Sequence, residues 1–158
     1  MLIRQATVND SEAIVYFIRS MLQDLAAING QAVNPDATVW SNFLTRVVAE
    51  IEEPNELYLC AESDGEIVGY LEGSIVQAFE LYVPVKSFHV SVVYVLPKNR
   101  RLGIATRLIE TALQWSGEKG CQEANLNVLV QNEAQYLYEK LGFSVAEYKM
   151  KRQISNPN

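Results

Sequence analysis

The sequence has a single histidine, two cysteines and no long apolar run, and each scarcity excludes a class of protein. Cys60 and Cys121 form no CxxC or other metal-type spacing, and His89 has no companion ligand, so we predict no metal site. No stretch approaches the ~18 uninterrupted apolar residues of a membrane-spanning helix, and the N-terminus lacks a signal-peptide pattern. We therefore expect a cytoplasmic protein with no membrane partner.

Positive charge is also scarce. The chain has 13 Lys and Arg against 19 Asp and Glu, and its formal net charge is -6. Binding to nucleic acid requires a basic surface that neutralises phosphates, so we predict no nucleic-acid partner. The exception is a short cationic stretch that contains Lys98, Arg100, Arg101 and Arg107. Its charge indicates a local anion site.

What is present is the composition of a folded domain. About half of the residues are hydrophobic (49%) and 20% are charged. A chain of 158 residues is long enough to bury one continuous core, and neither a repeat nor a Pro/Ser-rich linker divides it. We therefore treat residues 1–158 as a single domain.

The hydrophobic periodicity predicts a mixed α/β sheet. Helical spacing predicts helices over residues 10–30, 35–54, 104–119 and 132–140, the last capped by Asn132. Runs of β-favouring residues predict strands at 2–6, 56–62, 67–76, 88–96, 124–130 and 143–150. Asp64 and Gly65 form the expected hairpin turn between the second and third strands. The apolar segment 79–85 contains Pro84 and is either a loop or a bulged strand edge, and we expect it to be functional or interfacial.

The segment 93–106 leads from a strand directly into a helix, which suits an anion. The first turn of a helix has backbone N–H groups without partners and about half a positive charge. Gly103 and Ala105 keep the side chains small, so a diphosphate can approach these groups, and Arg100 and Arg101 add charge. Neither a Walker loop nor a three-glycine dinucleotide loop is present. The same residues also fit a plain turn with a solvated cationic face.

Two motifs in this region resemble one known family. Arg100-x-x-Gly103-x-Ala105 closely resembles the acetyl-CoA signature of the GNAT N-acetyltransferase superfamily, written Arg/Gln-x-x-Gly-x-Gly/Ala. The block from Asn132 through Tyr138 to the Leu-Gly-Phe turn at residues 141–143 resembles a second family motif. Only residues 88–144 carry this resemblance. It implies an α/β (α+β) fold with a mixed, mostly antiparallel twisted sheet of about six to seven strands, flanked by about four helices.

The resemblance also implies how coenzyme A is bound. Backbone groups of residues 93–95 would pair with the pantetheine arm, and N–H groups of residues 100–105 would hold the pyrophosphate. The implied cofactor-binding residues are Val93, Tyr94, Val95, Arg100, Arg101, Leu102, Gly103, Ile104, Ala105, Thr106 and Asn132. Two positions depart from the family pattern. Asn132 is one residue closer to Tyr138 than is usual, which leaves Gln131 at the usual place, and Arg101 replaces a frequent glycine.

The resemblance assigns one catalytic residue and leaves the base open. Tyr138 matches the family tyrosine that donates to the departing sulfur, although its helical spacing also fits a packed core residue. The family often has a glutamate where this chain has Asn127, which is unable to accept the proton of an ammonium. Glu72, Glu80 and His89 are candidate bases, and none is assigned.

The implied function is transfer of an acetyl group from acetyl-CoA, a cosubstrate, to a primary amine, without a metal. The acceptor is unidentified: a small amine, a peptide N-terminus and a lysine all fit, and so does a donor with a longer acyl group. One alternative is a non-catalytic acyl-CoA-binding or sensing module. Another is an interaction protein that forms a homodimer through the apolar segment 78–85.

Overall fold

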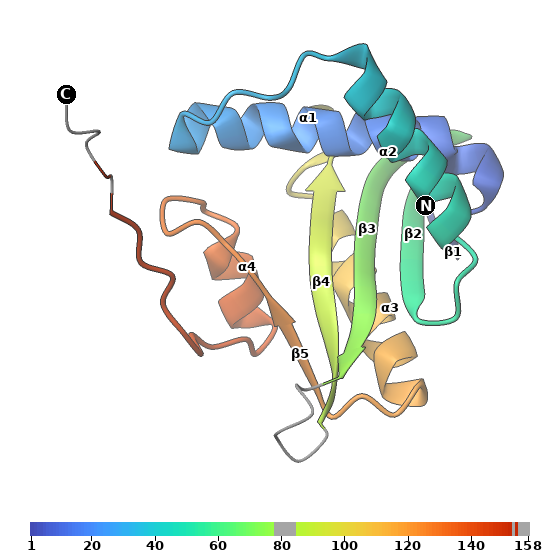
Figure 1. The fold of residues 1–158 in the computed structure, drawn as a ribbon. Helices are drawn as coiled ribbons and strands as arrows, with labels where there is room; N and C mark the ends of the chain where they lie inside the picture. The colour runs from blue at the N-terminus through green and yellow to red at the C-terminus, as the bar shows by residue number, and fades with distance from the viewer. Residues whose placement is uncertain (78–84, 153, 155–158) are drawn as a thin grey trace.

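The computed structural model describes residues 1–77, 85–152 and 154. The elements, in chain order, are β1 (Leu2–Gln5), η1 (Val8–Asp10), α1 (Ser11–Asn29), α2 (Ala37–Glu50), β2 (Glu56–Ser63), β3 (Glu66–Gln77), β4 (Lys86–Val95), η2 (Pro97–Asn99), α3 (Ile104–Glu118), β5 (Glu123–Leu126) and α4 (Gln135–Lys140). The described strands form one sheet in the order β1-β2-β3-β4-β5, antiparallel except for the β4–β5 pair (Figure 1). This confirms the mixed, mostly antiparallel sheet with four helices.

The hairpin turn forms as the sequence predicts, and local residues cap the helix ends. The Asp36 side chain accepts a hydrogen bond from the Thr38 N–H and so caps α2. Gly30 ends α1 with a left-handed φ of 72°. Asp64 and Gly65 have φ values of 53° and 80°, as a two-residue hairpin turn requires. None of the helices in the described residues has the length and apolar character that crossing a bilayer requires.

The strand expected at residues 124–130 is present but shorter, and the strand expected at residues 143–150 is absent from the described residues. β5 ends at Leu126 instead of Val130, and residues 144–152 have no regular secondary structure, so the described part of the sheet has five strands and not six or seven. A β-favouring run becomes a strand only when another strand satisfies its backbone groups. The helix expected from Asn132 begins at Gln135. The predicted loop 79–85 lies outside the described residues except for Val85.

Two hydrophobic cores lie on the two faces of the sheet. On one face, α3 contributes Ile104, Leu108, Ile109 and Ala112, which pack on Leu57, Leu59, Leu71, Phe88 and Val90. On the other face, α1 and α2 contribute Ile14, Phe17, Ile18, Val47 and Ile51, which pack on Tyr58, Cys60, Tyr70, Val92 and Tyr94. Figure 1 shows α3 behind the strands and α1 across their upper ends. The sheet therefore separates two distinct sets of buried side chains.

Candidate functional site

A β-bulge interrupts β4 at Ser91. Glu72 of β3 pairs with Val92 and Gly73 pairs with Val90, so Ser91 is an extra residue on β4. The bulge changes which face of the sheet the following side chains point to, as the two cores show. Val90 belongs to the α3-side core, whereas Val92 belongs to the core under α1 and α2. Without the bulge, two residues two apart would face the same side.

Beyond the bulge, one edge of β4 has no neighbouring strand. β5 pairs with residues 87–90 of β4, and the last pair is Val90 opposite Leu126. Residues 93–95 pair with β3 on their other side. The backbone of Val93 and Tyr94 therefore borders an open edge within the described part of the sheet. The carbonyl of Val95 is already engaged, because it accepts a hydrogen bond from Arg100 Nε at 3.0 Å.

The start of α3 has a run of backbone donors without partners. The first backbone bond into the helix is from the Arg107 N–H to the Gly103 carbonyl, at 3.1 Å. The N–H groups of residues 101–106 donate to no acceptor in the described part of the chain. These six consecutive donors lie at the positive end of the α3 dipole. Of the predicted pyrophosphate segment, residues 100–105, the N–H groups from Arg101 onward are thus free, whereas the Arg100 N–H donates to the Pro97 carbonyl at 3.3 Å.

Two residues in this turn have left-handed backbone conformations. Gly103 has a φ of 76° and Arg101 a φ of 65°. A glycine adopts this region freely, whereas a residue with a Cβ pays roughly 1–2 kcal/mol. Arg101 therefore holds a conformation that a glycine would adopt without this cost. Arg101 and Leu102 are both exposed, with Leu102 at 68%.

The side chain of Arg100 is directed to α1, which the sequence did not indicate. Its Nη2 donates to Asp24 of α1 at 2.6 Å, and its guanidinium lies 5.2 Å from the Tyr94 ring centre. The Tyr94 hydroxyl donates to the same carboxylate at 3.2 Å. Burial, followed by the Asp24 charge, raises the pKa of Tyr94. Arg100 therefore ties α1 to the end of β4, and Arg101 is left as the exposed cation of the turn.

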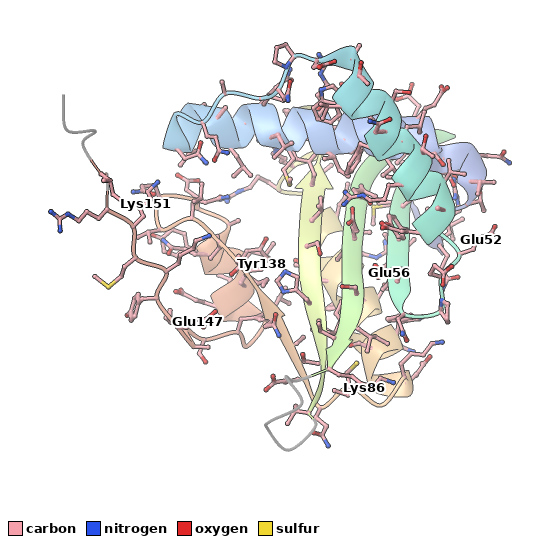
Figure 2. All side chains as sticks on the ribbon, in the orientation of Figure 1. Glu52, Glu56, Lys86, Tyr138, Glu147 and Lys151 are labelled. Carbon is pink, nitrogen blue, oxygen red and sulfur yellow. The ribbon has the colours of Figure 1, made fainter. Side chains whose placement is uncertain are left out.

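Tyr138 lies on α4, beside β4 and β5 where these two strands separate (Figure 2). It is half-buried against the α3-side core, with its ring edge-on to Phe143 at 6.1 Å. Within the described residues its hydroxyl makes no hydrogen bond, and burial raises its pKa. Tyr138 is therefore protonated at neutral pH and free to donate.

Asn132 contributes to the entry into α4. Its Oδ1 accepts a hydrogen bond from the Ala134 N–H at 3.0 Å, which orders the turn that precedes the helix. Its carbonyl accepts from the Gln135 N–H at 3.2 Å. The neighbouring Gln131 is exposed. The side-chain oxygen of Asn132 is thus engaged in a local turn.

Two of the three candidate bases are described, and both lie near the bulge. Glu72 is half-buried and accepts a hydrogen bond from the Tyr70 hydroxyl at 2.8 Å. Burial raises the pKa of Glu72, and the bond from Tyr70 opposes this rise. His89 Nδ1 lies 2.6 Å from Asn125 Oδ1. Glu80 lies outside the described residues.

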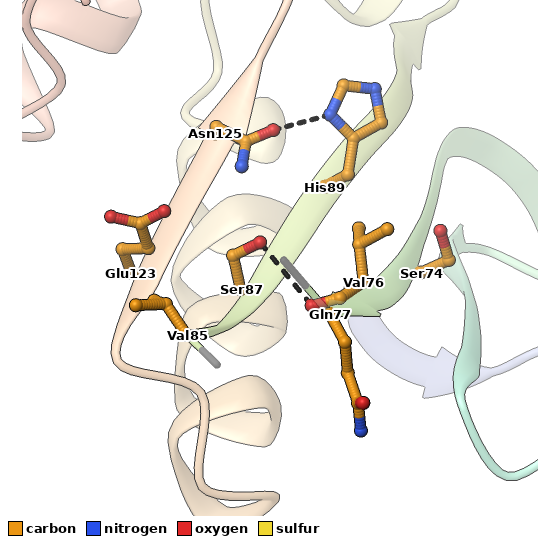
Figure 3. A pocket seen from close by; sticks show the side chains of 8 residues that line it. All are labelled: Ser74, Val76, Gln77, Val85, Ser87, His89, Glu123 and Asn125. Carbon is orange, nitrogen blue, oxygen red and sulfur yellow. Dashed lines mark hydrogen bonds between the residues drawn. The ribbon is translucent and has the colours of Figure 1, made fainter. Parts of the chain in front are cut away.

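His89 and Asn125 also line an open cavity of about 430 Å³ on the sheet (Figure 3). An amide oxygen accepts hydrogen bonds, so Nδ1 is the donor in this contact. The remaining lining residues are Ser74, Val76, Gln77, Val85, Ser87 and Glu123. Six of the eight lining residues have polar side chains, and one of these is a carboxylate, which suits a polar or cationic small molecule.

Comparison with known proteins identifies one family. The model of the acetyltransferase (GNAT) family matches residues 19–143. An N-alpha-acetyltransferase of Sulfurisphaera tokodaii is 38% identical over 102 residues, which are 61% of each chain. An aminoglycoside N(6')-acetyltransferase type 1 of Acinetobacter haemolyticus is 33% identical over 101 residues, 61% of this chain and 68% of the relative. The chain thus spans about three fifths of the first of these relatives.

A similar fold occurs in a solved structure. A mutant of the BH1408 protein from Bacillus halodurans superposes with a TM-score of 0.87 at 19% identity, covering 98% of this chain and 100% of that chain. At this identity the likeness concerns the fold. It covers almost the whole chain, including the first half, in which the sequence identified no motif.

Proposed function

Because this chain belongs to the acetyltransferase (GNAT) family, we propose that it transfers an acetyl group from acetyl-CoA to a primary amine. The proposal rests on two backbone features that follow each other along the chain. The open edge of β4 at residues 93–95 leads through a short turn to the free N–H groups of residues 101–106. Acetyl-CoA has the matching chemistry, with an amide-containing arm attached to a diphosphate. A single domain over residues 1–158 is part of the proposal.

The residues present suit this cosubstrate. A Cβ placed on Gly103 would meet no atom within 4 Å, so the space beside the free donors is open to a ligand. In the proposal, residues 101–106 hold the diphosphate through their N–H groups, and Arg101 adds a cation. Val93 and Tyr94 pair with the amides of the arm through their backbone, so their side-chain identity matters little. Asn132 contributes by ordering the turn near the thioester.

In the proposed reaction the amine nitrogen attacks the thioester carbon, the carbon–sulfur bond breaks, and the sulfur leaves with CoA. Tyr138 donates a hydrogen bond to that sulfur. A thiol is about 1.5 pKa units more acidic than a phenol, so complete proton transfer from Tyr138 is roughly 2 kcal/mol uphill. Burial raises the pKa of Tyr138 and increases this cost. Hydrogen bonding, instead of full proton transfer, is therefore the proposed role.

The acceptor must reach the thioester as a neutral amine. A lysine-like amine at pH 7 is mostly protonated, which costs about 4 to 5 kcal/mol. Glu72 and His89 Nε2 are the described groups near the bulge that are able to accept its proton. We propose that one of them acts, directly or through water. His89 lines the 430 Å³ cavity, and Glu72 precedes the lining residue Ser74 by two positions on β3, so we propose this cavity as the entry for the acceptor.

The class of acceptor is left open by the relatives, which are named as an N-alpha-acetyltransferase and as an aminoglycoside N(6')-acetyltransferase. Both acceptors are amines, and the polar lining of the cavity is compatible with either. A cytoplasmic location is also proposed. It is supported by the two unpaired cysteines, since disulfides are rare in the cytosol.

The experiment is a thiol-release assay with acetyl-CoA and a panel of polyamines, amino acids, aminoglycosides and peptides. With a good acceptor, Tyr138→Phe should lower kcat about tenfold or more and leave the Kd for acetyl-CoA nearly unchanged. Tyr136→Phe, on the exposed side of the same helix, is the matched control and should retain full turnover. Equal turnover of both variants would remove Tyr138 from this role. Tight CoA binding with no transfer to any amine would support the non-catalytic module instead.

A further inference from the structure

Asp24 of α1 receives two hydrogen bonds from the end of β4 and the turn after it. Arg100 Nη2 donates to its Oδ2 at 2.6 Å, and the Tyr94 hydroxyl donates to the same oxygen at 3.2 Å. Figure 1 shows the end of β4 beneath α1. The side chains of Asp24 and Arg100 are 49% and 44% exposed. An ion pair this open to water contributes little to the stability of a fold, so stability alone does not account for it.

The guanidinium of Arg100 is engaged by the protein on several sides. Its Nε donates to the Val95 carbonyl at 3.0 Å, and its Nη2 donates to Asp24. Its central carbon lies 5.2 Å from the centre of the Tyr94 ring. The charge of Arg100 is thus paired with a carboxylate, and its donors are directed to β4 and α1. Arg100 therefore fixes the turn, whereas the exposed Arg101 supplies the cation for an anion.

The turn needs this support because the residue after Arg100 is strained. Arg101 has a φ of 65°, in the left-handed region that a residue with a Cβ avoids. A strained backbone conformation persists only where the surrounding contacts hold it. The free N–H groups begin at this same residue and continue to Thr106. Relaxation of Arg101 to a negative φ would rotate the peptide planes around it and so change the arrangement of these donors.

We propose that Asp24 is a positioning residue for acetyl-CoA. Asp24 holds Arg100, Arg100 holds the turn, and the turn keeps the donors of residues 101–106 in the conformation that binds the diphosphate. Asp24 itself does not touch the cosubstrate. The inference rests on the proposed binding of acetyl-CoA to this turn. It adds a residue of α1, a helix whose sequence carries no part of the acetyl-CoA signature.

The charge of Asp24 makes the direction of the effect diagnostic. A carboxylate beside an anion site repels the anion, so removal of the charge would by itself strengthen binding. If Asp24 positions the turn, its removal lets the turn leave the binding conformation, and the apparent Kd rises in inverse proportion to the competent fraction. A competent fraction of about one tenth to one fifth raises the Kd about five- to tenfold. The two explanations therefore predict shifts of opposite sign.

The first test is Asp24→Ala in the full chain. Alanine removes the charge and both hydrogen bonds, and it is a good helix former at an exposed position of α1, so the fold is retained. Titration calorimetry should show a Kd for acetyl-CoA raised about five- to tenfold. Glu12→Ala removes the same charge at an exposed position near the start of α1 and, as the matched control, should leave the Kd unchanged. An unchanged or lower Kd for Asp24→Ala would overturn the proposal.

Steady-state kinetics separates positioning from a loss of folded protein. With a good acceptor from the amine panel, Asp24→Ala should raise the KM for acetyl-CoA and leave kcat at saturation nearly unchanged. A smaller folded fraction would instead lower kcat at an unchanged KM, and this result would contradict a positioning role.

A double-mutant cycle tests whether Asp24 acts through Arg100. Arg100→Ala should raise the Kd for acetyl-CoA at least as much as Asp24→Ala, and the two changes together should raise it no further. Additive effects would show that the two residues act separately and would refute the proposed route. A wild-type chain that binds no acetyl-CoA would refute the proposed function itself, whereas normal binding by both the wild type and Asp24→Ala refutes only the role of Asp24.

Discussion

Two glycines at opposite ends of α3 offer a matched test of the diphosphate site. Gly103 precedes the helix with a φ of 76°, and Gly120 follows it with a φ of 82°. A Cβ on either residue would meet no atom within 4 Å. Alanine at each site therefore introduces the same backbone strain and no steric clash.

The strain sets the expected effect on stability. A left-handed conformation costs a residue with a Cβ roughly 1–2 kcal/mol, and the loss of unfolded-state freedom offsets about 0.4–1 kcal/mol of this. Gly103→Ala and Gly120→Ala should each lower the free energy of unfolding by about 1 kcal/mol. Urea denaturation followed by circular dichroism measures both.

The two variants should differ in affinity for acetyl-CoA. At Gly103 the new methyl group enters the open space beside the free N–H groups of residues 101–106, where the diphosphate is proposed to bind. We expect Gly103→Ala to raise the Kd for acetyl-CoA tenfold or more, equivalent to about 1.4 kcal/mol, and Gly120→Ala to leave it unchanged. Titration calorimetry measures the Kd. Equal affinities of the two variants would refute the assignment of this turn to the diphosphate.

Three further predictions concern the sheet and its caps. The Arg4 guanidinium lowers the pKa of Asp10 to about 2, so this carboxylate stabilises the fold above pH 4. Asp10→Asn should cost about 2 kcal/mol at pH 7 and reduce the loss of stability between pH 4 and 2 by about the same amount, as urea titrations across this range will measure. A Cβ at Gly73 would come within 2.4 Å of an aromatic carbon and 2.6 Å of a backbone oxygen. Gly73→Ala should therefore lower the stability of the fold by about 1–3 kcal/mol, as thermal unfolding will measure. Gly117→Ala is the control, because this glycine lies in α3 with no atom near its Cβ position, and it should not destabilise the fold. Of Glu72→Gln and His89→Gln, the variant that removes the base should lower kcat/KM at least about tenfold, and unchanged turnover of both would exclude both residues as the base.

The sequence by itself determined the features that depend on neighbours within a few residues. The apolar spacing of α1 and α2, the cap at Asp36 and the turn at residues 64–65 are local, because a helix or a tight turn satisfies its backbone groups within four residues. The acetyl-CoA signature at residues 100–105 is equally local. The family and the free donors of α3 could therefore be predicted from the sequence alone.

Only the tertiary structure decided which distant residues meet. Arg100 contacts Asp24, 76 residues away, and the bulge at Ser91 is visible only in the pairing with β3. The same dependence explains the strand expected at residues 143–150. Its β-favouring composition is a local property, but a strand needs a partner for its backbone, and no partner lies beside it in the described part of a single copy.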